Sequence, residues 1–144
     1  MNSNKVCIDA SLVLTWLLST EPDEKIDSLW REWLERGIEF MVPPLFHAEV
    51  ASVIREQVYF KRILPEEGEE AFSIYEEIPV TGVGTPDVYR KAWELAREFN
   101  LPRTYDMQYL AVAELEDCEL WTSDKSLVNS LKHRDKRIRW VGKV

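Results

Sequence analysis

Short apolar runs alternate with longer helix-like segments along the whole chain, and this alternation limits the folds that are open to it. Strands that alternate with helices are typical of a parallel sheet covered by helices on both faces. The sequence therefore predicts a three-layer α/β/α sandwich around a central parallel sheet. Its strands are expected at Lys5–Ile8, Glu39–Val42, Ile78–Thr81, Glu119–Thr122 and Arg137–Val141.

Helices are expected in the intervals between these strands. From Ile26 to Leu34, apolar residues recur with the helical i, i+3, i+4, i+7 spacing, after Pro22 and before Gly37. Ser11 is expected to cap the first helix. No repeat or linker divides the chain, so residues 1–144 are expected to form a single domain. The other predicted helices span Ser11–Ser19, Pro43–Phe60, Pro65–Glu77, Asp87–Phe99, Thr104–Glu116 and Lys125–Leu131.

The composition indicates a soluble globular protein, with 45% hydrophobic and 31% charged residues. No apolar run approaches the roughly 18 residues that a membrane span requires. The N-terminal segment reaches Asp9 too soon to contain a secretory h-region, so the expected compartment is the cytoplasm. The net charge of −8 argues against loose electrostatic binding of nucleic acid as the main function.

Four acidic residues lie in segments whose neighbours are apolar: Asp9, Glu49, Asp106 and Asp124. An ionised carboxylate in such surroundings is costly unless its pKa shifts or an ion pair or metal ion compensates it. Asp9 and Asp124 each follow a predicted strand, so both fall on the sheet edge where ligands bind in such folds. Glu49 and Asp106 are expected on inward helix faces. If the four converge, they form an oxygen-ligand site for Mg²⁺ or Mn²⁺, which suits phosphodiester hydrolysis.

Each acid also has a structural explanation. Asp9 and Asp124 suit helix N-caps, and Asp106 suits the first turn of a helix because of the macrodipole. These explanations stay open at the level of the sequence.

Glu49 is the hardest of the four to explain structurally, because neither a cap nor the dipole accounts for an inward acid in mid-helix. Its best alternative is a buried ion pair with Arg55 or Arg103. His47 lies about 200° around the helix from Glu49, so the two side chains cannot ligate one ion.

The segments around the four acids resemble those of a known family. They read Ile-Asp9-Ala-Ser11, Pro-Pro-Leu-Phe-His-Ala-Glu49-Val-Ala, Tyr-Asp106-Met-Gln-Tyr-Leu-Ala-Val-Ala-Glu114 and Leu-Trp-Thr122-Ser-Asp124-Lys-Ser-Leu. In this order and spacing, from Val6 to Val141, they resemble the PIN domain, especially VapC-type toxin ribonucleases. The resemblance implies Mg²⁺- or Mn²⁺-dependent cleavage of RNA, a homodimer and a cognate antitoxin protein.

The resemblance also implies a role for each acid. Asp9 and Asp106 would be direct metal ligands, and Asp124 a direct or water-mediated one. Glu49 would orient the attacking water or hold a second ion. Accessory polar positions correspond to Ser11 and Thr122, whereas Ser52 departs from the asparagine that relatives often have.

Two other functions compete with the ribonuclease hypothesis. A non-catalytic module with the same fold would bind a partner protein or RNA, although the intact acid set speaks against it. A haloacid-dehalogenase-like phosphohydrolase also begins with an aspartate after the first strand. That family needs a second aspartate where Ser11 stands, so it is discounted.

Two further features bear on partners. The last twenty residues hold seven Lys or Arg against one acid, Asp135. The basic cluster at 132–139 suits either phosphate contacts or a solvated loop. Trp16, Trp30 and Trp33 fall in the first two predicted helices and are expected mainly in the core, although an exposed subset would suit a dimer or antitoxin groove.

Overall fold

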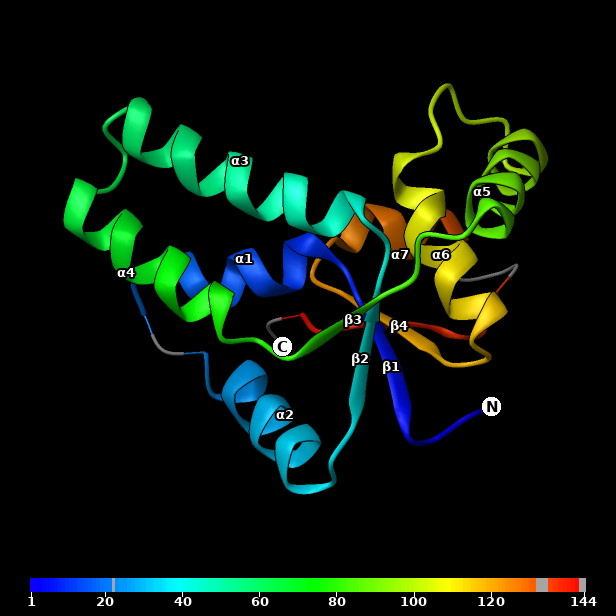
Figure 1. Cartoon of the computed structure of the whole chain (residues 1–144), viewed down its shortest axis with the longest axis horizontal. Coiled ribbons are helices and arrows are strands. Elements are labelled where there is room, and N and C mark those ends of the chain that lie inside the picture. Colours follow the sequence, from blue (N-terminus) through cyan, green and yellow to red (C-terminus); the bar gives the residue numbers. More distant parts are fainter. Residues whose placement is uncertain (22, 132–134, 143–144) are drawn as a thin grey trace.

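A computed structural model of the chain describes residues 1–21, 23–131 and 135–142. In this part of the chain, five strands form one parallel sheet in the order β3-β2-β1-β4-β5 (Figure 1). The predicted α/β architecture with a central parallel sheet is confirmed. The strands are β1 (Lys5–Ile8), β2 (Glu39–Val42), β3 (Val80–Gly82), β4 (Glu119–Thr122) and β5 (Ile138–Trp140).

Helices occupy the intervals between the strands. The segment 10–35 forms two helices, and the segments 45–76 and 86–115 form two more each. Their bounds are α1 (Ala10–Leu18), α2 (Glu24–Glu35), α3 (Leu45–Tyr59), α4 (Pro65–Glu76), α5 (Pro86–Glu98), α6 (Tyr105–Leu115) and α7 (Lys125–Leu131).

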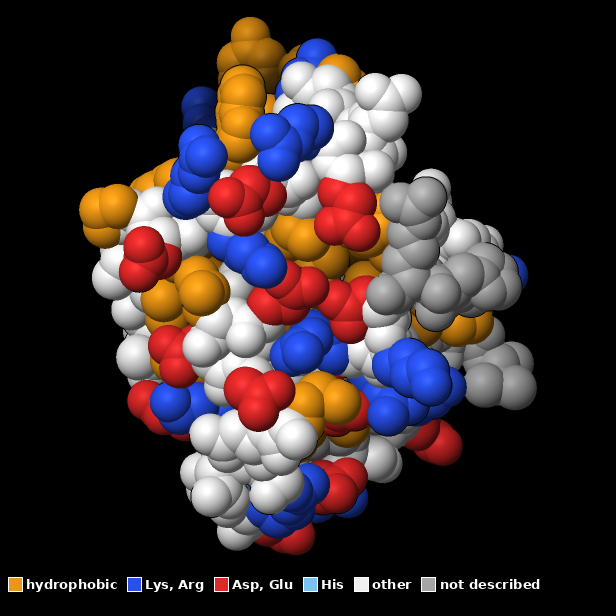
Figure 2. Space-filling model, turned by 90° about the vertical axis from the view of Figure 1, so that its right-hand side faces the viewer, with side chains coloured by type: hydrophobic (Ala, Val, Ile, Leu, Met, Phe, Trp, Pro, Cys, Tyr) orange, Lys and Arg blue, Asp and Glu red, His pale blue; other side chains and the backbone are white. Residues whose placement is uncertain are grey.

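The helices form layers on the two faces of the sheet. Figure 1 shows α5 and α6 packed together on one side, while α1, α2 and α4 lie on the other with α3 along α1 and α4. Figure 2 views the side of α5 and α6, where acidic and basic side chains are interspersed. No helix in the described part of the chain is long and apolar enough to cross a membrane.

The central strand is buried on both faces, as its composition predicts. Val6, Cys7 and Ile8 are all buried, which explains why β1 is a continuous apolar run and not an alternating one. On one face of the sheet, Trp30 and Trp33 of α2 pack their rings against Phe40 of β2. The distances between ring centroids are 5.1 and 5.7 Å. These two tryptophans belong to the core, as expected.

The structure decides between the two candidate caps of α1 and corrects the start of α2. Asp9, and not Ser11, caps α1, because its carboxylate accepts the N–H of Leu12. Asp23 caps α2 in the same way, whereas Pro22 lies outside the described residues. Leu34 also departs from the predicted apolar face, since its side chain is 60% exposed.

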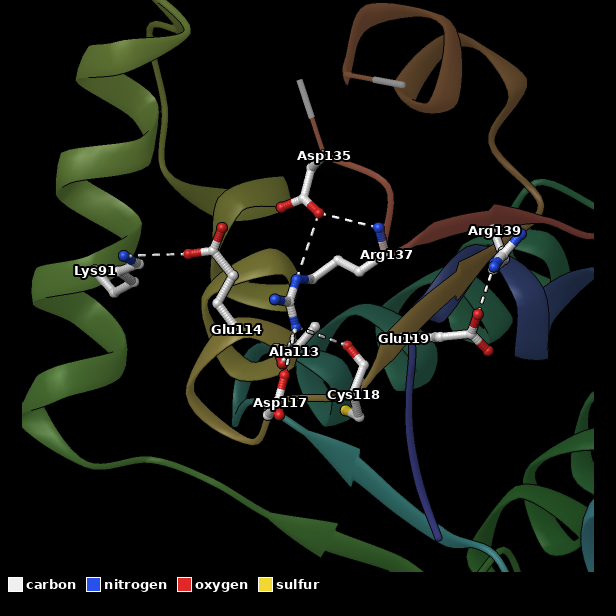
Figure 3. Close-up of polar contacts among 9 residues, drawn as sticks. All are labelled: Lys91, Ala113, Glu114, Asp117, Cys118, Glu119, Asp135, Arg137 and Arg139. Carbon is white, nitrogen blue, oxygen red and sulfur yellow. Dashed lines mark hydrogen bonds and ion pairs between the residues drawn. The ribbon is translucent and has the colours of Figure 1, made fainter. Parts of the chain in front are cut away.

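The C-terminal strand is fastened to the sheet by Arg137 (Figure 3). Its guanidinium donates to the carbonyl oxygens of Ala113 and Cys118 at 3.1 and 3.2 Å. It also forms ion pairs with Asp135 at 3.4 Å and Asp117 at 3.7 Å. Arg137 therefore joins the end of α6 and the start of β4 to the segment that leads into β5.

Candidate metal and phosphodiester site

Asp9 lies at the carboxyl end of the central strand, inside a network of hydroxyl groups. Its Oδ1 accepts the Ser11 hydroxyl at 2.7 Å and the Leu12 N–H at 3.0 Å. Its Oδ2 accepts the Thr122 hydroxyl at 2.5 Å. The two hydroxyl groups lie 3.1 Å from each other, so Ser11 and Thr122 brace this carboxylate from both sides.

Burial dominates the electrostatics of Asp9. Only 5% of the residue is exposed, and desolvation raises its pKa from 3.8 to about 6. The hydrogen bonds from Thr122, Ser11 and Leu12 oppose this rise, while the charge of Asp106 adds to it. Without a cation, the ionised form of Asp9 is therefore held at a cost in free energy.

The neighbouring strand brings Asp124 to the same edge of the sheet. Ile8 pairs with Trp121, which places Asp9 beside Thr122 and Asp124 two residues further along. The Asp124 carboxylate accepts the N–H of Leu127 at 3.2 Å, and its own N–H donates to the Thr122 hydroxyl at 3.0 Å. The same hydroxyl thus contacts both acids.

Glu49 reaches the site from the second turn of α3. Its Oε1 accepts the phenol of Tyr109 at 2.6 Å, and its side chain is half-buried. Desolvation raises the pKa of Glu49, the Tyr109 hydrogen bond lowers it, and the charge of Asp106 raises it again. Glu49 forms no ion pair within the described residues, so the alternative of a pair with Arg55 or Arg103 is wrong for them.

Asp106 occupies the first turn of α6 and interacts electrostatically with all three other acids. Its charge raises the pKa of both Asp9 and Glu49, and its own pKa is raised by desolvation and by the charge of Asp124. Asp106 is exposed, so the predicted inward orientation is wrong. Asp106 therefore couples to the buried Asp9 and the half-buried Glu49 from an exposed position.

The structural explanations for the acids hold only in part. Asp9 and Asp124 do act as caps, of α1 and α7, and Asp106 does stand in a first turn. These local roles coexist with the grouping of the four at one edge. Capping uses only Oδ1 of Asp9 and Oδ1 of Asp124, and Oδ2 of Asp9 accepts the Thr122 hydroxyl instead.

Tyr109 is a site residue for which the sequence predicted no role. It is 2% exposed, and burial and the neighbouring Glu49 raise the pKa of its phenol, which keeps it a donor. The available signal was its position three residues after Asp106, on the same helix face.

The residues present suit a hard divalent cation by their chemistry, because every candidate ligand is a carboxylate or hydroxyl oxygen. The buried hydroxyl of Ser123, beside Asp124, has no hydrogen-bond partner among the described residues. Within the same residues, no three acidic, histidine or cysteine side chains already converge as ligands of one ion.

Two other sequence candidates lie apart from these acids. His47 is exposed and contacts the phenol of Tyr75. In the basic cluster at 132–139, Arg139 forms an ion pair with Glu119 at 2.6 Å (Figure 3). Arg137 makes the hydrogen bonds and ion pairs described above. Residues 132–134 lie outside the described part of the chain. Both arginines are therefore engaged within the protein and do not form a ready phosphate site.

Comparison with known proteins gives a consistent result. The sequence profile of the PIN domain matches residues 6–130. The chain is 26% identical over 122 residues to VapC ribonuclease Mb0985 of Mycobacterium bovis, a match that covers 85% of this chain and 87% of the relative.

Two solved structures share the fold. VapBC2 from Rickettsia felis, bound to a DNA fragment from its promoter, gives a TM-score of 0.69 at 13% identity, over 97% of this chain and 99% of that one. VapC20 of Mycobacterium tuberculosis, a sarcin–ricin loop cleaving toxin, gives a TM-score of 0.60 at 17% identity. The match covers 88% of this chain and 95% of that one.

Proposed function

Because the chain belongs to the PIN domain family and is related to VapC ribonucleases, we propose that it is a metal-dependent endoribonuclease. It hydrolyses RNA phosphodiester bonds and acts as the toxin of a type II toxin–antitoxin pair. The observation that carries this proposal is that Asp9 and Asp124 meet on the Thr122 hydroxyl at the carboxyl ends of β1 and β4, with Asp106 in electrostatic coupling to the other acids. Structural caps alone need no such coupling.

The residues divide into two groups in this proposal. Asp9 and Asp106 are the direct metal ligands and Asp124 is a direct or water-mediated one, while Ser11 and Thr122 hold the Asp9 carboxylate in one orientation. Glu49, positioned by Tyr109 at 2.6 Å, orients the water that attacks the phosphorus. Its raised pKa favours uptake of a proton from that water.

A bound Mg²⁺ or Mn²⁺ would lower the pKa of water and stabilise charge on the phosphate during in-line attack. The chain supplies the negative site that attracts such an ion. Desolvation and mutual repulsion raise the pKa of Asp9, Asp106 and Glu49, and a divalent cation relieves both costs. Binding of a divalent cation would therefore stabilise the ionised forms of the four acids.

The proposal includes partners and a compartment. VapBC2 of Rickettsia felis shares the fold, which supports a cognate antitoxin protein for this chain. We include a homodimer and the cytoplasm in the proposal on the basis of the family.

The direct test is cleavage of a defined single-stranded RNA with Mg²⁺ and with EDTA. We expect Asp106→Asn to lower cleavage by about 100-fold or more, the size of effect seen when one catalytic charge contact is removed. Asp87→Asn is the matched control, since Asp87 stands in the first turn of α5 as Asp106 does in α6. Full cleavage by Asp106→Asn, or by the wild type in EDTA, contradicts the proposal and favours a non-catalytic binding module.

The toxin assignment needs a separate test. We expect the product of a short adjacent reading frame to copurify with the chain and to inhibit cleavage. A chain that cleaves RNA and has no such inhibitor is a nuclease outside a toxin–antitoxin pair.

A further inference from the structure

The outer face of α5 carries two large aromatic side chains that lie in solvent. Trp93 is 57% exposed and Tyr89 is 46% exposed. They stand four residues apart, so one ring lies above the other on the same helix face, about 6 Å apart along the axis. In the described part of the chain, neither ring contacts another ring or a cation. Exposed tryptophans were expected among those of the first two helices, whereas Trp93 lies in α5.

Arginines share this face. Arg97 follows Trp93 by one turn, is exposed, and forms no ion pair among the described residues. Arg90 pairs only with Glu94 on its own helix, at 3.3 Å in an exposed setting, where such pairs contribute little and exchange readily. Tyr89, Arg90, Trp93 and Arg97 together are called the α5 face below.

The C-terminal end of the α5 face is connected by a short segment to the helix that contains Asp106. Arg97 lies in the last turn of α5, and the connection 99–104 joins that end to the first turn of α6, which contains Asp106. Exposed Arg103 and the 56%-exposed Tyr105 lie on this path. Figure 1 places the connection at the top of the molecule, and at that level Figure 2 shows hydrophobic and basic side chains next to one another.

We propose, resting on the ribonuclease function above, that the α5 face binds the single-stranded RNA substrate next to the cleavage site. Bases stack on Trp93 and Tyr89, while Arg97 and Arg103 contact phosphates. Single-strand binding sites combine aromatic rings for stacking with cations that follow the backbone. On a chain of net charge −8, Arg97 and Arg103 form no ion pair within the described residues, so both can contact a polyanion beside the exposed rings.

A similar pairing elsewhere fits RNA less well. At the far end of α3, Tyr59 is 66% exposed, but the guanidinium of Arg55 already lies 5.8 Å from its ring centroid. Tyr59 also lies ten residues beyond Glu49, about 15 Å further along the helix. Tyr59 is therefore a matched control: an exposed aromatic residue with a neighbouring arginine, away from the cleavage site.

The experiment measures binding of a fluorescent single-stranded RNA of about 20 nucleotides by anisotropy. The full chain with Asp9→Asn serves as parent, so that the RNA survives. We expect Trp93→Ala and Trp93→Leu to weaken binding roughly 5- to 150-fold, the range for one stacked base. Trp93→Phe retains most of the affinity, because its ring still stacks. Tyr59→Ala leaves the affinity unchanged.

Salt dependence separates the roles of ring and charge. We expect Arg97→Ala to reduce the slope of log affinity against log salt by about 0.7, the contribution of one phosphate contact on a single strand. Trp93→Leu leaves this slope unchanged. Arg31→Ala, at an exposed position on α2, serves as the charge control.

The competing occupant is a second copy of the chain, and the same variants distinguish it. The proposal is overturned if Trp93→Leu binds RNA like its parent. It is also overturned if Trp93→Ala converts a dimer into a monomer in sedimentation while RNA affinity per chain is unchanged. Cleavage by the wild type is measured separately, so Trp93-dependent binding without Mg²⁺-dependent cleavage supports the RNA face and contradicts only the ribonuclease proposal.

Discussion

At the residue scale, Asp9 shows how a local role and a site role coexist in one carboxylate. Its Oδ1 caps α1, while its Oδ2 accepts the Thr122 hydroxyl from the neighbouring strand. The residue is only 5% exposed. A buried carboxylate whose pKa rises from 3.8 to about 6 costs the folded state about 3 kcal/mol at neutral pH.

We therefore expect Asp9→Asn to stabilise the metal-free protein at pH 7 by about 1–3 kcal/mol, because the amide removes the buried charge and keeps an acceptor for the cap. Thermal unfolding in EDTA measures this change. Added Mg²⁺ should raise the melting temperature of the wild type and have no effect on the variant. Asp87→Asn is the control, and a variant that melts below the wild type in EDTA contradicts the prediction.

The phenol of Tyr109 allows a second test on a single atom. Tyr109→Phe removes the 2.6 Å hydrogen bond to Glu49, and hydrogen bonds to charged groups contribute about 1.5–3 kcal/mol. We expect kcat for RNA cleavage to fall about 10- to 100-fold with KM nearly unchanged. Tyr75→Phe is the matched control, since that phenol contacts only His47 among its hydrogen-bonding partners in the described chain. Equal loss of activity in both variants would show a general effect on packing.

At the element scale, the central strands were predicted more accurately than the edge strands. The predicted bounds of β1, β2 and β4 agree with the structure, because each is an apolar run. β3 starts two residues later than expected, at Val80, and β5 is shorter by one residue at each end. The pairing of Phe40 with Val80 and of Val42 with Gly82 sets the extent of β3, and that pairing is a property of the sheet.

The last strand also gives an element-scale prediction. Arg137→Met removes the side-chain hydrogen bonds to the carbonyl oxygens of Ala113 and Cys118 and the ion pair with Asp135, so we expect a loss of about 1.5–3 kcal/mol in the free energy of unfolding. Arg139→Met is the control: its pair with Glu119 is exposed, and we expect a loss below about 1 kcal/mol. Denaturant titration measures both, and equal effects would contradict the role assigned to Arg137.

At the scale of the whole molecule, the coupled acids make both stability and activity depend on pH. Between about pH 4 and 6, Asp9 of the metal-free fold holds a proton that the unfolded chain has released. Its contribution to stability is therefore present at low pH and is lost as the pH rises through about 6. Repulsion raises the pKa of Glu49 and Asp106 as well, which adds in the same direction.

We expect metal binding to show the opposite dependence, because a cation must displace the proton from Asp9. The apparent affinity for Mg²⁺, and RNA cleavage at limiting Mg²⁺, should fall below about pH 6, approaching about tenfold per pH unit. Isothermal titration between pH 5 and 7.5 checks the affinity, and an affinity that is flat across this range would contradict it.

The sequence by itself determined the fold class and singled out four acids as candidates for the site. Alternating buried strands and amphipathic helices permit few architectures other than a covered parallel sheet, and acids in apolar segments stand out by their energetic cost. It offered both Ser11 and Asp9 as caps of α1, and it did not determine the exposure of Asp106 or the Tyr109–Glu49 contact. Those depend on which helix packs beside which strand, over separations of 60 residues for Tyr109 and Glu49. The local periodicity of a sequence carries no information about contacts between residues so far apart in the chain. Only tertiary packing decides these contacts.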